Sequence, residues 1–267
     1  MGELSDWTSD TRLVRAFLPP ADPCGISQDS WPSTVPAARQ LLDAGLELAP
    51  GVTILVGENG SGKSTVVEML AEAYGLNPQG GSILAPSVRV RETEPGAGHY
   101  LTVQRGIGGR SAWAYFLRAD TMHSLYSYLE QHPGKSRERF HELSHGQGFL
   151  EILRTRVNQR GFYLMDEPDA PLSFISCLSL VALPHDLAGA GSQVVIATHS
   201  PIVASVPGAR ILDSGTGGSG PPSGRTWRSF SPGARSSAIP AGSSATCSRT
   251  RKTRSRPRRR GGPRPSG

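Results

Sequence analysis

The chain has 267 residues, which suits one or two domains with a full hydrophobic core. Its net charge of +6 averages two unlike parts, because residues 1–213 hold 16 basic and 22 acidic residues and residues 214–267 hold 12 basic and no acidic ones. The pI of 9.6 therefore does not mark the first part as a nucleic-acid-binding domain. No stretch approaches the ~18 apolar residues of a membrane helix, and three widely spaced cysteines fit neither a disulfide framework nor a zinc site. We expect a cytoplasmic protein without a membrane segment.

Strands and helices alternate along the first part of the chain. Residues 12–18 predict a first strand, and the apolar run 52–56 predicts a strand followed by a helix over 63–74. Two β-rich runs, 87–92 and 99–105, predict an antiparallel hairpin beside the main sheet. The later expected elements are an apolar run at 113–117, a helical patch near 121–131, a helix at 144–159, a strand at 161–166, a helix at 173–188 and a strand at 193–198. This order predicts an α/β fold with a mostly parallel core sheet flanked by helices, and an antiparallel β subdomain.

The strongest motif is GENGSGKST at 57–65, which fits the phosphate-loop pattern G-x-x-x-x-G-K-[ST] between the expected strand and helix. Its glycines let successive backbone N–H groups point at phosphate oxygens, and the helix N-terminus adds partial positive charge. Lys63 would reach the β- and γ-phosphates, Ser64 would bind Mg²⁺, and Thr65 would contact the α-phosphate side. The nucleotide-binding residues expected here are Gly57, Glu58, Asn59, Gly60, Ser61, Gly62, Lys63, Ser64 and Thr65.

Polar residues follow the two later strands at their carboxyl ends, where open α/β sheets bind ligands. Asp166 suits Mg²⁺, together with Ser64. Glu167 would be the general base that polarises the attacking water. His199 follows the strand at 193–198 and could touch both the γ-phosphate and that water. The expected catalytic residues are therefore Glu167 and His199.

The segment HELSHGQG at 141–148 has two interpretations. In the first, His141, Glu142 and His145 form the H-E-x-x-H motif of a zinc protease. The longer form of that motif needs a third histidine, and the chain has Glu151 at that position.

The second interpretation rests on the start of a helix. Ser144 and Gln147 form a capping box before an apolar periodic run, which predicts that the helix begins at 144 and leaves His141 outside it. Residues 143–147, LSHGQ, are then a variant of the L-S-G-G-Q signature of ATP-binding-cassette ATPases, which grips the γ-phosphate of a nucleotide held by the opposite subunit. In this interpretation the expected nucleotide-binding residues of the segment are Ser144, His145, Gly146 and Gln147.

The phosphate loop, signature, acidic pair and histidine together resemble an ATP-binding-cassette-type ATPase. The stretches VGENGSGKST, FLRAD, HELSHGQGFL, YLMDEPDAPLS and GSQVVIATHSP are similar to the AAA family ATPases related to RecF-type and structural-maintenance-of-chromosomes heads, over residues 12–212. The resemblance implies that Arg118 and Asp120 line the nucleotide side and that Ala170–Ser173 meets the opposite subunit. Pro171, Asp169 and Gln147 depart from the family pattern, but none of these departures removes a phosphate, metal or water ligand.

The resemblance implies a head without a coiled-coil arm, since Lys63 and Ser144 are too close in sequence to enclose one. Two chains would sandwich two ATP molecules, with Ser144 and Gly146 of one chain completing the site of the other. ATP would close this homodimer and hydrolysis would open it, which passes a change of shape to a protein or DNA partner in DNA repair or phage defence. A transporter nucleotide-binding subunit is the alternative, and a zinc protease is a remote one. Trp31 is a candidate for stacking on adenine, although a loop tryptophan more often packs against the protein.

Residues 214–267 are rich in Ser, Arg, Pro and Gly and are expected to be disordered, which leaves residues 1–213 as the ATPase head. One interpretation is a basic arm for nucleic acid. The other is a C-terminus translated out of frame, because a neighbouring reading frame can encode a helical ending that resembles that of the family.

Overall fold

The computed structural model describes residues 10–19, 26–84, 96–107, 109, 112–119, 150, 153–214 and 227–230. All of these residues belong to one compact unit, Met1–Ala234. No helix within them combines the length and the apolar composition that crossing a bilayer requires.

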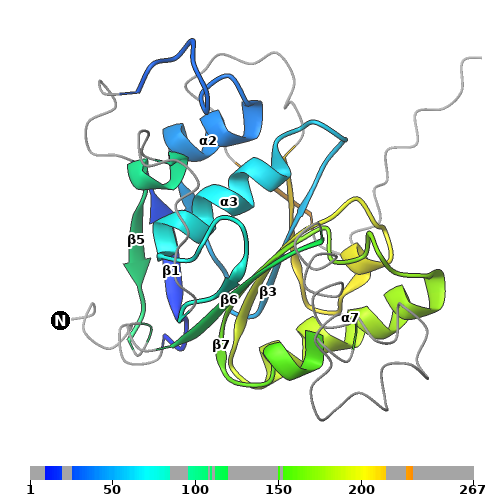
Figure 1. Ribbon diagram of the computed structural model, residues 1–267. Coiled ribbons are helices and arrows are strands. Elements are labelled where there is room, and N and C mark those ends of the chain that lie inside the picture. The colour runs from blue at the N-terminus through cyan, green and yellow to red at the C-terminus, as the bar shows by residue number, and fades with distance from the viewer. Residues whose placement is uncertain are drawn as a thin grey trace, which may run out of the picture. The chain divides into compact units, whose positions relative to one another are not determined.

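A seven-stranded sheet with the order β10-β9-β3-β8-β7-β6-β4 forms the centre of this unit (Figure 1). Its inner strands run parallel, and the two edge strands pair antiparallel with their neighbours. The inner strands are β3 (Val52–Val56), β6 (Trp113–Arg118), β7 (Gly161–Asp166), β8 (Gln193–Ala197) and β9 (Arg210–Asp213), and the edges are β4 (Gly81–Ser82) and β10 (Arg228–Phe230). The prediction of a mostly parallel core sheet is confirmed.

A second, three-stranded antiparallel sheet has the order β2-β1-β5. It consists of β1 (Val14–Leu18), β2 (Leu46–Glu47) and β5 (Thr102–Arg105). The expected strand over 99–105 is therefore wrong at its start, because Ala97–Tyr100 forms the 3-10 helix η2. Strand β5 pairs with β1, and the other expected arm of the hairpin, 87–92, lies outside the described residues.

Helices cover both faces of the main sheet. Helix α3 (Lys63–Tyr74) lies on one face with α2 (Pro36–Ala44) beside it, and α7 (Phe174–Gly189) lies on the other (Figure 1). Because side chains alternate along a strand, Leu164 of β7 joins the core on the α3 side and Met165 joins the core on the α7 side. Of the helix expected at 144–159, residues 150 and 153–159 are described; residues 150 and 153–156 are helical, but 157–159 are not, so the predicted end of the helix at 159 is wrong.

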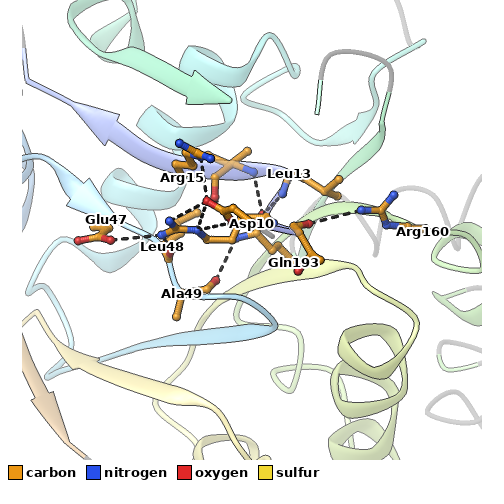
Figure 2. Close-up of polar contacts among 11 residues, drawn as sticks. Asp10, Leu13, Arg15, Glu47, Leu48, Ala49, Arg160 and Gln193 are labelled. Carbon is orange, nitrogen blue, oxygen red and sulfur yellow. Dashed lines mark hydrogen bonds and ion pairs between the residues drawn. The ribbon is translucent and has the colours of Figure 1, made fainter. Parts of the chain in front are cut away.

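Gln193 joins the two sheets at the amino end of β8, as Figure 2 shows. Its side-chain oxygen accepts hydrogen bonds from the backbone N–H groups of Leu13 and Val14, both at 2.7 Å. Its side-chain nitrogen donates to the carbonyl oxygens of Val14 and Ala49, both at 2.9 Å. The amide is 3% exposed and has partners for its oxygen and both of its N–H groups, so this buried polar side chain is fully satisfied.

A charged cluster lies beside this amide (Figure 2). Asp10 accepts hydrogen bonds from Arg12, whose Nη2 lies 2.8 Å from Oδ2, and pairs with Arg15 Nε, also at 2.8 Å. The Arg12 side-chain bond lowers the pKa of Asp10 to about 2. Arg12 also reaches Glu47 of β2, so the cluster ties the segment before β1 to its neighbouring strand.

The expectation of a disordered segment from 214 onward needs a correction at residues 227–230. Residues 228–230 form β10, which pairs antiparallel with β9. Trp227 packs against the hydrophobic core, and its indole Nε1 donates to Gly45 O at 2.8 Å. A tryptophan that packs its ring against the core and finds a partner for its indole N–H can order a segment whose composition predicts disorder. The other residues of this segment, apart from Ser214, lie outside the described part.

Candidate functional site

The phosphate-loop motif connects β3 to α3, as expected. Gly60 and Gly62 have φ angles of 78° and 95°, in the left-handed region that favours glycine. A Cβ atom on Gly62 would lie 2.2 Å from Val35 Cγ1. Residues 58–60 form the exposed turn of the loop, and Thr65 lies in the first turn of α3. Glycine at 62 is therefore required both by the backbone angle and by the approach of the preceding loop.

Lys63 begins α3 and is only 3% exposed. Its ammonium donates to the carbonyl oxygens of Gly57 and Glu58, each at 3.0 Å, and lies 3.3 Å from His199 Nδ1. Burial lowers the pKa of Lys63, and the nearby carboxylates of Glu167 and Asp166 oppose that shift. A buried cation is thus held at the centre of the loop by oxygens of the loop itself.

Ser64 and Asp166 form the second contact of the site. Ser64 Oγ donates to Asp166 Oδ1 at 3.0 Å, and Asp166 ends β7 with 6% of its surface exposed. Burial raises the pKa of Asp166 to about 6, although the Ser64 bond and Arg118 act in the opposite direction.

These two oxygen donors fit Mg²⁺. Magnesium uses one or two protein oxygens and completes its shell with water and phosphate. Within the described residues no group of three His, Cys, Asp or Glu is placed to hold a metal ion, so a cage made by this part of the protein alone is absent. A cation beside Asp166 would also favour the ionised form that burial disfavours.

Glu167 and His199 meet in front of the loop. His199 Nε2 lies 2.9 Å from Glu167 Oε1, and His199 Nδ1 lies 3.0 Å from Gly57 O. Glu167 has a φ of 47°, a left-handed conformation that costs free energy for a residue with a Cβ. The backbone N–H of Glu167 donates to Ala197 O at 2.9 Å, which fixes this turn against the end of β8. The strained turn aims the Glu167 carboxylate at the histidine.

A pair of residues that the sequence analysis did not connect links the two strand-end loops. Thr198 is fully buried, and its hydroxyl donates to Asp169 Oδ1 at 2.6 Å. The same hydroxyl oxygen accepts from the backbone N–H of Ser200 at 2.9 Å. Asp169 follows Glu167 by two residues and Thr198 precedes His199, so this bond holds the two loops together. The sequence contains no periodic or motif signal for this pairing.

Arg118 lies at the carboxyl end of β6, in register with Asp166 of β7. It forms an ion pair with Glu68 of α3 at 2.6 Å and donates to Pro78 O at 3.0 Å. That Arg118 lines the nucleotide side stays a prediction. Asp120 lies outside the described residues.

The remaining candidates are placed only in part. Ser144, His145, Gly146 and Gln147 lie outside the described residues, and so do His141 and Glu142 of the alternative interpretation. The segment 170–173 follows Asp169 directly and is largely exposed. Trp31 is 57% exposed in the loop that precedes α2.

Comparison with known proteins finds one matching family model and several distant relatives. Residues 41–170 match the family described as ABC transporter. The ribose import ATP-binding protein RbsA of Roseobacter denitrificans is 28% identical over 202 residues, which cover 67% of this chain and 39% of that protein. The chain thus spans well under half of the ribose-import relative. The cytochrome c biogenesis ATP-binding export protein CcmA of Rhodopseudomonas palustris is 29% identical over 181 residues, 63% of this chain and 88% of that protein.

Among solved structures, the SMC head domain from Thermotoga maritima is 15% identical, with a TM-score of 0.38. The match covers 63% of this chain and 88% of that domain.

Proposed function

We propose that the chain is an ATP-binding-cassette-type ATPase that hydrolyses ATP with Mg²⁺ and works as a conformational switch, closing on ATP and opening after hydrolysis. The observation that carries the proposal is the convergence of Lys63, Ser64, Asp166, Glu167 and His199 at the carboxyl edge of the parallel sheet. A site at this edge of an open α/β sheet is where ligands bind.

Phosphate binding falls to residues 57–65. The backbone N–H groups of the loop and the N-terminus of α3 would face the phosphate oxygens. Two loop carbonyls already position Lys63. One of its three N–H donors would turn to a phosphate oxygen when nucleotide binds. Ser64 and Asp166 would hold Mg²⁺, which supplies positive charge against the phosphates when bound.

Water activation falls to Glu167. Its carboxylate would accept a proton from the attacking water, and His199 holds that carboxylate at 2.9 Å. The bond between His199 and the loop carbonyl of Gly57 keeps the ring next to the phosphate end of the site. His199 would therefore contact the γ-phosphate and orient the Glu167 carboxylate at the same time.

We further propose that two copies close around two nucleotides, each completed by Ser144, His145, Gly146 and Gln147 of the other. Support comes from the sequence of residues 143–147 and from the family match, which runs through that segment. The exposed segment 170–173 beside the site is available for the same contact. The proposed partner beyond the dimer is DNA or a protein, and the proposed location is the cytoplasm.

The test is light scattering after size exclusion on the Glu167→Gln variant, with and without Mg²⁺-ATP. Slowed hydrolysis should trap the closed state, so the mass should double only with nucleotide. Lys63→Ala in the same background is the matched control, because it should lose nucleotide binding and stay monomeric. A Glu167→Gln variant that binds ATP and never dimerises would contradict the switch, and a wild-type chain that does not bind ATP would contradict the whole proposal.

A transporter subunit is the second candidate, since the relatives at 28% and 29% identity are named as import and export ATP-binding proteins. The two functions separate by stimulation of ATP turnover. Added double-stranded DNA should raise the rate of the switch, whereas a transporter subunit should respond only to its membrane component.

A further inference from the structure

Ser214 is the first residue after β9 and is 1% exposed. Its backbone N–H donates to Val56 O at 2.8 Å, and its hydroxyl lies 2.9 Å from the same oxygen. The hydroxyl also lies 3.0 Å from the hydroxyl of Ser61 in the phosphate loop. Val56 ends β3 and Gly57 opens the loop, so Ser214 contacts the loop at its entry and again at its interior.

The directions of these hydrogen bonds follow from the chemistry of the groups. A carbonyl oxygen only accepts, so the single hydroxyl hydrogen of Ser214 goes to Val56 O. Ser61 must then donate its own hydrogen to the oxygen of Ser214. This leaves the lone pairs of Ser61 Oγ free to face Lys63 Nζ, which lies 3.5 Å away.

We propose that Ser214 is a positioning residue of the nucleotide site, acting on Lys63 through Ser61. By accepting the hydrogen bond of the Ser61 hydroxyl, Ser214 keeps the lone pairs of Ser61 Oγ directed at the ammonium and fixes the curvature of the loop before nucleotide binds. The inference rests on the proposed function, because it concerns the same phosphate loop.

The strand pair that carries Ser214 supports this role. Strand β9 pairs with β3 on one side and with β10 on the other, and Trp227 before β10 donates to Gly45 O. Ser214 therefore contacts the phosphate loop, and residues 227–230 are tied to the same unit through β9 and Gly45. The predicted end of the ATPase head at residue 213 would separate Ser214 from β9, the strand that positions it.

The test compares Ser214→Ala, Ser61→Ala and the double variant in the full chain. A fluorescent ATP analogue measures Kd, steady-state hydrolysis gives KM and kcat, and thermal unfolding without nucleotide gives Tm. Ser192→Ala is the matched control, because Ser192 is a similarly buried serine whose hydroxyl accepts from Gly161 N at the opposite end of the sheet.

We expect each single variant at 214 or 61 to raise Kd and KM about five-fold, the equivalent of one lost hydrogen bond, with kcat unchanged. The double variant should be no weaker than the single variants, because both remove one chain of bonds. Ser192→Ala should lower Tm and leave Kd unchanged.

Two results would overturn the inference while the wild type binds ATP: an unchanged Kd for Ser214→Ala, or additive losses in the double variant. If Ser214→Ala does not fold, Ser61→Ala decides, since an unchanged Kd in that variant also overturns it. If the wild-type protein does not bind ATP, that result would instead contradict the proposed function.

Discussion

Replacing Thr198 by valine tests whether the bond to Asp169 holds together the two loops that carry Glu167 and His199. Valine matches threonine in shape, so the change removes a fully buried hydroxyl and little else. It deletes one hydrogen bond to a carboxylate at 2.6 Å and one from Ser200 N at 2.9 Å. Bonds to charged groups contribute about 1.5–3 kcal/mol and neutral ones about 1 kcal/mol. Because Asp169 is only partly buried and water can replace its partner, we expect a loss of about 2 kcal/mol in the free energy of unfolding.

The effect on hydrolysis should exceed the effect on stability. Without the bond, the turn at Glu167 can relax from its φ of 47° and release strain of about 1–3 kcal/mol. The Glu167 carboxylate would then leave its position 2.9 Å from His199. Since misplacement by about 1 Å can cost a factor of about 100, we expect kcat to fall at least about ten-fold. KM for ATP should stay unchanged, because Lys63 and Ser64 do not contact Thr198.

Steady-state hydrolysis and urea unfolding measure both quantities on the same protein. Thr53→Val is the matched control, since Thr53 is a buried threonine of β3 in the same sheet. It should change stability alone. Equal kcat values for the two variants, or a rise in KM for Thr198→Val, would refute the reasoning.

Three further outcomes follow from the described contacts. Gln193→Leu should lower the free energy of unfolding by about 4 kcal/mol in urea titration, because four hydrogen bonds from the side chain to main-chain groups are lost, three of them buried; a loss below about 1 kcal/mol would contradict this. Asp10 has a pKa of about 2 against 3.8 unfolded, so its stabilisation is complete above about pH 4 and disappears as the pH falls toward 2; the stability gap to Asp10→Asn should close over that window, and a constant gap would exclude the ion pairs as its cause. Gly62→Ala should abolish nucleotide binding in an equilibrium titration, because its Cβ would meet Val35 at 2.2 Å, whereas Gly75→Ala, with a similar φ of 99° and open space, should bind normally.

The parts of the site that follow local rules could be predicted from the sequence. The spacing of residues 57–65 fixes a loop between a strand and a helix, and the structure has that arrangement at β3 and α3. Strand ends place Asp166 and His199 at one edge, because parallel strands end on the same side. These inferences need only the chain order and the direction of the strands.

Other contacts depend on which distant residues meet, and the sequence does not reveal them. Strand 12–18 was predicted, but its membership of a separate sheet is set by pairing with β2 and β5. The strand at 228–230 was missed because its neighbours are rich in Ser, Pro and Gly, whereas the partial burial of Trp227 depends on packing against the distant core and on a hydrogen bond to Gly45. The pairing of Thr198 with Asp169 likewise requires two loops to meet in space.

Strand β8 illustrates how the fold separates stability from catalysis. At its amino end Gln193 binds main-chain groups of the small sheet, and beyond its carboxyl end Thr198 contacts Asp169 and His199 contacts Glu167, the proposed general base. Substitutions at the amino end remove buried bonds far from the nucleotide, so they should lower the melting temperature and leave kcat intact below it. Substitutions at the carboxyl end act on side chains held by a few hydrogen bonds and a strained turn, so small losses of stability should accompany large losses of rate. We therefore expect substitutions at the amino end of β8 to change stability more than kcat, and substitutions at its carboxyl end to change kcat more than stability. If both ends served only packing, both sets of variants would change stability alone.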